Sequence, residues 1–487
     1  MRIISGISTA ALLAWMLVGL PSRAQEPVAP ESTPAGDSAS ATEPVAGTTD
    51  AQPSAPASSH SKVRIVRLSE VKGEVQLDRQ TGKGFESAMT NLPVIEGERL
   101  QTANGVAEIE FEDNSTVRVA QNSLVEFPRL ELLPSGAKAS AVTVVHGMVY
   151  VNLLNTKGNE FTVNVGQNKI NLPPDSHIRL QLMKDQVSLA VLHGQAMVEE
   201  PSGPSTVGKD KTLTFSLAGE SQPVIAKNVT REPLDSWDQD AVQYHKSFAN
   251  ASSYGNSPYS YGINDMNYYG SFASGCGGSF WRPYFASASW SPYGSGAWAY
   301  YPSAGYSWVS PYPWGWTPYH YGSWGFCQGL GWGWQPGGMW MGLANNSLFS
   351  SPGKGSSPLP HPPIHAPTAA ESSLVGVNLK AIPTSSLGGH DTFVFRNDSA
   401  GLGVPRGSLG KLNSFSNQAT QHGMASTNVY YGGAQRGAAE SPVRGSYSES
   451  ASSAHSAGPS YSGASGAGMS HAAGPSGGGS SGGGGRH

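Results

Sequence analysis

Residues 106–117, VAEIEFEDNSTV, contain the pattern on which the fold assignment depends. Glutamates alternate with Ile109 and Phe111, so the acidic and apolar side chains point to opposite faces of an extended strand. Asp113-Asn114 then favours a tight turn, because both residue types tolerate positive φ. We therefore expect a hairpin with its acidic residues on the solvated face and in the turn: Glu108, Glu110, Glu112 and Asp113.

Short β-branched runs recur about every ten residues through residues 63–217, broken by Gly, Asn, Asp or Pro,. This spacing predicts a mainly β fold, an antiparallel sandwich or roll, with enough apolar residues to bury its own core. The expected strands are 63–68, 73–77, 99–102, 106–111, 116–119, 123–127, 141–146, 148–153, 160–165, 168–172, 177–182, 186–191, 195–199 and 212–215.

The first 24 residues have the features of an export signal. Arg2 is followed by the short apolar stretch 7–20, and Ser22-Arg23-Ala24 places small residues at a cleavage site,. We expect cleavage before Gln25 and a periplasmic or secreted protein, with an uncleaved anchor as the alternative. No later apolar stretch is long enough to span a membrane. Residues 25–62, rich in Ala, Pro, Ser and Thr, are expected to form a disordered linker,.

Three further segments follow the β region. Residues 232–249 predict an amphipathic helix, with a proline near its start and apolar residues spaced three and four apart,. Residues 254–343 are rich in Tyr, Trp and Gly and contain ten of the twelve tryptophans. Residues 344–487 are rich in Ser, Gly, Ala and Pro and are expected to be disordered, apart from local strands at 374–382 and 391–395.

Several classes of function are disfavoured. The formal net charge is −4, and no basic stripe is present that would bind nucleic acid,. We find no nucleophile elbow, phosphate loop or metalloprotease motif, and we predict neither catalytic residues nor a cofactor. The two cysteines, Cys276 and Cys327, lack histidines at zinc-ligand spacing, and after export they could form a disulfide,. His146 and His193, each followed by Gly, are expected to be strand-end or turn residues.

The β region resembles the FecR domain, the periplasmic domain of bacterial iron-transport regulators. The matching segments are Gly73-Glu74-Val75, residues 96–102, residues 106–117, His146-Gly147-Met148-Val149-Tyr150-Val151, Phe161-Thr162-Val163 and His193-Gly194. The resemblance implies a β fold and an envelope location. Two features depart from it: Pro173-Pro174-Asp175-Ser176 replaces the usual Gly-containing turn, and an export signal replaces the regulators' cytoplasmic segment and spanning helix.

The aromatic region resembles a domain of unknown function that often follows FecR-like domains. The resemblance rests mainly on residues 313–324, PWGWTPYHYGSW, with residues 265–270, 305–309 and 331–334. Tyrosine and tryptophan rings suit stacking on sugars, and the alternative is that they fill the core of a domain poor in aliphatic residues. The candidate stacking residues are Trp308, Trp314, Trp316, Tyr319, Tyr321 and Trp324.

Three functions remain open at this point. The first is a non-enzymatic binding or scaffolding protein of the cell envelope, with an envelope protein or cell-wall polysaccharide as its partner. The second is a polysaccharide-binding module that uses exposed aromatic rings. The third is a periplasmic signalling regulator of the FecR type.

Overall fold

The computed structural model describes residues 64–199, 204–218, 222–250, 252–255, 257, 259–275, 277–344, 360–379, 385–386 and 392–428. All of them belong to His60–His487, the second of two compact units of the chain. The predicted signal, the predicted linker and residues 429–487 lie outside the described residues. No helix in the described part is long and apolar enough to cross a membrane.

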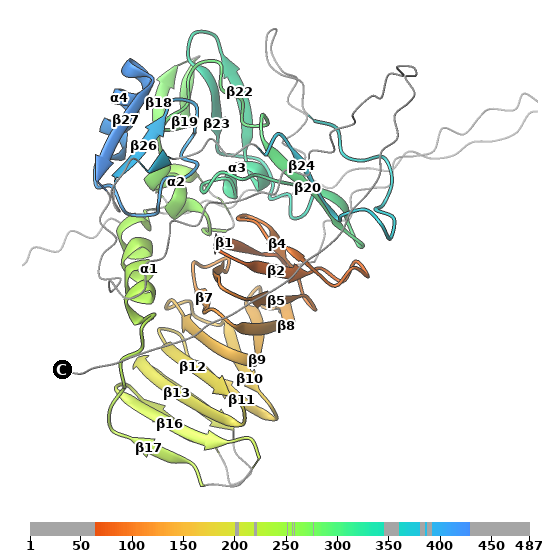
Figure 1. Ribbon diagram of the computed structural model, residues 1–487, viewed down its shortest axis with the longest axis vertical. Coiled ribbons are helices and arrows are strands. Elements are labelled where there is room, and N and C mark those ends of the chain that lie inside the picture. The colour runs from red at the N-terminus through yellow and green to blue at the C-terminus, as the bar shows by residue number, and fades with distance from the viewer. Residues whose placement is uncertain are drawn as a thin grey trace, which may run out of the picture. The chain divides into compact units, whose positions relative to one another are not determined.

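The FecR-like region contains two sheets. The first is antiparallel and consists, in spatial order, of β4 (Pro93–Val94), β1 (Val66–Lys72), β6 (Val106–Glu110), β7 (Thr116–Val119), β9 (Lys138–Asn152), β12 (His177–Met183), β13 (Gln186–His193), β16 (Lys211–Ser216) and β17 (Val224–Ala226). Figure 1 shows β12, β13, β16 and β17 as successive arrows of this ladder.

The second sheet shares β9 with the first. Its spatial order is β3 (Phe85–Ser87), β2 (Val75–Asp78), β5 (Arg99–Thr102), β8 (Ser123–Leu132), β9, β10 (Glu160–Val165), β11 (Asn168–Asn171), β14 (Gln195–Glu199) and β15 (Ser205–Gly208). All pairs are antiparallel except β9 with β10, which is parallel. The predicted mainly β, antiparallel fold is confirmed, and each strand expected between residues 63 and 217 overlaps an observed one.

Strand β9 differs from the prediction, which placed separate strands at 141–146 and 148–153. One strand runs through Gly147, pairing with β8 and β10 before it and with β7 and β12 after it. Gly147 has φ +94°, and a Cβ there would lie 2.1 Å from the Ser123 Oγ. Between the two expected strands the glycine therefore makes no break; it lets a single strand cross from one sheet to the other.

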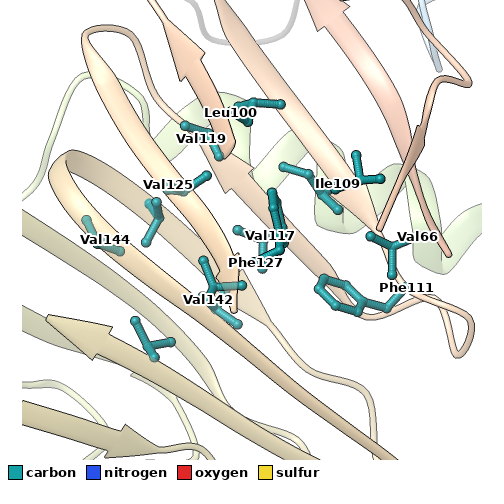
Figure 2. Close-up of a cluster of buried hydrophobic side chains, with 14 of the residues drawn as sticks. Val66, Leu100, Ile109, Phe111, Val117, Val119, Val125, Phe127, Val142 and Val144 are labelled. Atoms are coloured by element: carbon teal, nitrogen blue, oxygen red, sulfur yellow. The ribbon is translucent and has the colours of Figure 1, made fainter. Parts of the chain in front are cut away.

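The core forms where apolar faces of the two sheets meet. Side chains from several strands converge there, including Val66, Ile109, Val117, Phe127 and Val142 (Figure 2), and these five are fully buried. The apolar side of the 106–117 hairpin therefore lies where alternation placed it.

The region after the β sheets contains helices and two small sheets. The helices are α1 (Asp235–Phe248), the single 3₁₀ turn η1 (Ser252–Tyr254), α2 (Ile263–Tyr269) and α3 (Thr317–His320). The sheets are β18 (Gly270–Gly275), β19 (Gly278–Pro283), β23 (Gly331–Gln335) and β22 (Ser323–Cys327), and β21 (Gly305–Val309), β20 (Gly296–Tyr301) and β24 (Leu374–Val377). Helix α1 confirms the helix expected at 232–249, whereas no strand between β18 and β23 was predicted.

Part of the tail expected to be disordered is folded. Strand β24 and β26 (Thr392–Arg396) confirm the two local strands, and β26 lies between β25 (Ser385–Ser386) and β27 (Met424–Asn428). Helix α4 (Leu412–His422) was not predicted and corrects the expectation for this segment. Its Leu412 and Ala419 are buried in the aromatic core, which explains why a segment with few apolar residues is ordered here.

Candidate functional site

The six rings predicted to stack on a ligand are all buried. Their exposed fractions are 4% or less, and they belong to hydrophobic clusters rather than to a surface: Trp308, Trp314, Trp316, Tyr319, Tyr321 and Trp324. An exposed stacking platform built from these residues is therefore wrong. With few aliphatic side chains in the region, the aromatic rings fill its interior.

Contacts of Trp314 show how the rings pack. Its indole lies 5.0 Å from the Tyr312 ring in a stacked pair and 5.9 Å from the Trp324 ring. Its Nε1 donates a 2.7 Å hydrogen bond to the Ala400 carbonyl, and the Trp324 Nε1 donates one of 3.1 Å to Pro318. These polar groups are thus satisfied inside the protein, as buried indoles require.

Cys327 is buried at 5% exposure and is disulfide-bonded. The chain has one other cysteine, Cys276, which lies outside the described residues. The pairing of Cys276 with Cys327 stays a prediction.

The acidic hairpin face contradicts the sequence expectation. Glu108 and Glu110 are fully buried and Glu112 is 4% exposed, whereas Asp113 in the turn is partly exposed. The alternation was interpreted correctly, but the face opposite the apolar core is itself covered by α1 and by the turn into α2. The two buried glutamates must therefore be compensated by charges within the protein.

A row of polar residues crosses this covered face. Register places Glu108 beside Arg118, then Tyr150, then Arg179, on β6, β7, β9 and β12. Helix α1 lies over this row of residues, and the acidic residues of the helix contact the row. Asp235 accepts hydrogen bonds from Arg179 at 2.6 and 2.8 Å and from the Tyr150 hydroxyl at 2.9 Å.

The next turn of α1 continues these contacts. Asp238 pairs with Arg118 at 2.8 Å and with His177 at 2.9 Å, and His245 lies 3.0 Å from Glu108. The helix therefore packs acidic residues and a histidine on the sheet, while its apolar residues Tyr244 and Phe248 pack against the aromatic core.

Glu108 and Asp265 form the centre of the cluster, and Arg406 joins them. The Arg406 Nη1 donates to Glu108 at 2.8 Å, while its Nη2 and Nε donate to Asp265 at 2.6 and 2.9 Å. Asp265 also pairs with Arg67 and accepts a 2.7 Å hydrogen bond from the Tyr244 hydroxyl. Strand β6, helix α2 and the segment before α4 thus meet at one guanidinium. We call these residues the ionic cluster: Arg67, Glu108, Glu110, Arg118, Asp238, Tyr244, His245, Asp265 and Arg406.

Burial and charge compete in the titration of these acids. Burial acts to raise the pKa of Glu108, but His245, Arg118 and Arg406 outweigh it and hold that pKa well below the ordinary value. Burial likewise opposes ionisation of Asp265, and Arg406 and Arg67 lower its pKa. Burial raises the pKa of Glu110, because Arg67 offsets the desolvation only in part. Glu108 and Asp265 are thus the ionised partners of Arg406.

The ionic cluster is better suited to joining segments of the chain than to catalysis. Each central carboxylate is already bonded to guanidinium groups, and no group of His, Cys, Asp and Glu in the described residues could hold a metal ion. A hollow of about 330 Å³ lies elsewhere, beside His146, Met148 and Gln181. A second, of about 30 Å³, lies beside Glu112 and has room for little more than a water molecule,.

Sequence reasoning missed Asp265 and Arg406. Asp265 appeared only as a landmark of the aromatic region, and Arg406 lay in a segment expected to be disordered. A usable signal is the scarcity of charge: between residues 247 and 353 the sequence contains only Asp265 and Arg282 as charged residues. An isolated charge in a chain of buried rings requires a partner.

Two family models match parts of the chain. Residues 98–197 match the family described as FecR protein. The chain contains a FecR domain. Residues 263–361 match DUF6600, a family of unknown function, so a domain of unknown function follows the FecR domain as the sequence indicated. The FecR match spans β5 to most of β14 and leaves β1, β16 and β17 outside it.

Two crystal structures of a proposed anti-sigma factor from Parabacteroides distasonis are similar to part of the chain. Their identities are 11% and 12%, the similar part covers 29% and 28% of this chain, and the TM-scores are 0.25 and 0.24. The match spans 64% and 62% of those chains, less than two thirds of either. No curated protein matches the chain.

Proposed function

We propose that this chain is a non-enzymatic FecR-domain protein of the bacterial envelope that binds a protein partner, with the domain that follows fixed to the FecR domain as a structural extension. The ionic cluster is the observation that supports this most directly. It joins Arg67, Arg118 and Glu108 of the β region to Asp265, Asp238 and Arg406 of the segments that follow.

Two further observations favour a protein partner over the alternatives. The rings that would have formed a polysaccharide platform are core residues. The β region, by contrast, leaves large apolar side chains in solvent: Met183 at the end of β12 is 63% exposed, and Val224 and Ile225 on the edge strand β17 are 63% and 47% exposed. Neighbouring exposed apolar residues, such as Val224 and Ile225, are typical of protein contact surfaces,.

The test is cross-linking of the tagged full chain in the envelope of its own cells, followed by identification of the products. A protein reproducibly cross-linked to the FecR domain is the expected result. Retention on purified cell-wall polysaccharide without any protein product would refute the proposal.

A FecR-type signalling regulator is the second candidate, favoured by the FecR match alone. N-terminal sequencing of the protein recovered from cells separates the two functions. A start at Gln25 excludes direct contact with a cytoplasmic factor, whereas a retained N-terminus supports the regulator.

A further inference from the structure

Strand β17 ends the first sheet with an open edge. Among the described residues it pairs only with β16, through Thr212 with Ala226, Leu213 with Ile225 and Thr214 with Val224. All three β17 residues are exposed. An outermost strand leaves main-chain N–H and C=O groups available to another strand.

The hydrophobic core is also incomplete at this edge. A row of paired residues runs through Val149, Leu180, Leu189 and Leu213, which are 0–1% exposed, and ends at Ile225, which is 47% exposed. One more strand beside β17 would bury the end of the row. The edge therefore favours an occupant with an apolar residue opposite Ile225.

Two lysines give the edge a charge preference. The register that pairs Thr212 with Ala226 places Lys211 beside Lys227, and both are exposed. They lie two residues from Leu213 and Ile225, on the same face of the sheet. No carboxylate in the described part of the chain forms an ion pair with either lysine, and like charges on neighbouring strands repel.

We propose that β17 is completed by an extended strand of a protein partner, which places an apolar residue against Ile225 and a carboxylate two residues away against Lys211 and Lys227. The inference rests on the proposed function and specifies its contact surface. A second copy fits less well, because antiparallel self-pairing centred on Ile225 would set Lys227 against Pro223, which offers no negative charge.

The first experiment measures binding of defined strands to the full chain by fluorescence anisotropy. The probes are two labelled peptides of alternating threonine and valine, identical except for one Glu or one Lys two residues from the central valine. We expect the Glu peptide to bind about fivefold more tightly than the Lys peptide. In the double variant Lys211→Glu, Lys227→Glu the Lys peptide should bind more tightly than the Glu peptide. The variant Ile225→Lys should bind neither peptide.

A matched control is the double variant Lys169→Glu, Lys246→Glu, which makes the same charge change at exposed sites away from the edge. It should keep the preference for the Glu peptide. Equal binding of the two peptides, or the same preference in both double variants, would overturn the proposal. So would a dimer of the wild-type chain that Ile225→Lys converts to a monomer, because the occupant would then be a second copy.

Cross-linking in the envelope separates this inference from the function on which it rests. If the wild-type chain gives a cross-linked protein and Ile225→Lys does not, the proposed function and the edge-strand inference are both supported. If both chains yield it equally, the edge is not the contact surface and the proposed function remains. If wild type yields none, the proposed function fails.

Discussion

Replacing Arg406 by Met should detach the segment that contains it. Arg406 makes three charge-assisted hydrogen bonds to Glu108 and Asp265, and its side chain is only 11% exposed. Methionine fills a similar volume but leaves two buried carboxylates short of a partner. Loss of one member of such a buried group costs about 3–5 kcal/mol.

The Ala400 amide is a direct reporter of this detachment, because it donates a 2.9 Å hydrogen bond to the Phe285 carbonyl in the aromatic region. Hydrogen exchange measured by mass spectrometry should show this amide exchanging about 150- to 5,000-fold faster in the variant. Exchange within β12 and β13 should change far less.

Arg129→Met is the matched control. Arg129 also pairs with two carboxylates, those of Glu131 and Glu160, but its side chain is 45% exposed. Its loss should cost less than about 1 kcal/mol. If Arg406→Met altered exchange at Ala400 no more than the control does, the ionic cluster would not be what holds the segment in place.

Three further predictions concern stability. Burial raises the pKa of Glu98 well above its ordinary value, so its stabilising contribution is present in acid and lost as the pH rises; Glu98→Gln should raise the melting temperature at pH 8 and leave it nearly unchanged near pH 4,. Burial lowers the pKa of His320 to about 4, so wild type should lose roughly 3 kcal/mol as the pH falls from 6.5 to 4, and His320→Gln should remove most of that loss in urea titrations,. Gly147→Ala should destabilise by at least about 1–3 kcal/mol more than Gly136→Ala, since both glycines have positive φ but only Gly147 would place a Cβ against Ser123; equal effects would exclude steric contact as the cause,.

Most of the β fold was predictable because each strand contains its own alternation and is bounded by turn residues. The face covered by α1 was not predictable in the same way. The local sequence around a glutamate on the face away from the core is the same whether that face is exposed to water or is covered by a helix and paired with an arginine. Only the tertiary partners make the burial of Glu108 tolerable: His245 from α1, Arg118 from the next strand and Arg406 from a distant segment,.

The prediction of an exposed stacking surface in the aromatic region was wrong for a related reason. Composition shows that Trp314 and Trp324 are large and amphipathic, which suits either a core or a binding surface. The feature that decides between them is the hydrogen-bond acceptor of each indole, here the carbonyls of Ala400 and Pro318. Ala400 lies in the tail, so neither local composition nor the aromatic motif indicates it.

Strand β9 has a mechanical consequence. Its 15 residues are one uninterrupted length of backbone, hydrogen-bonded to four other strands in two sheets. Tension applied to one sheet therefore reaches the other along a covalent chain rather than through side-chain contacts. To separate the sheets, a pulling force must break the main-chain hydrogen bonds between β9 and its neighbouring strands in one sheet. Several of these hydrogen bonds bear the force at the same time. The FecR domain should thus unfold under tension as a single unit rather than one sheet at a time.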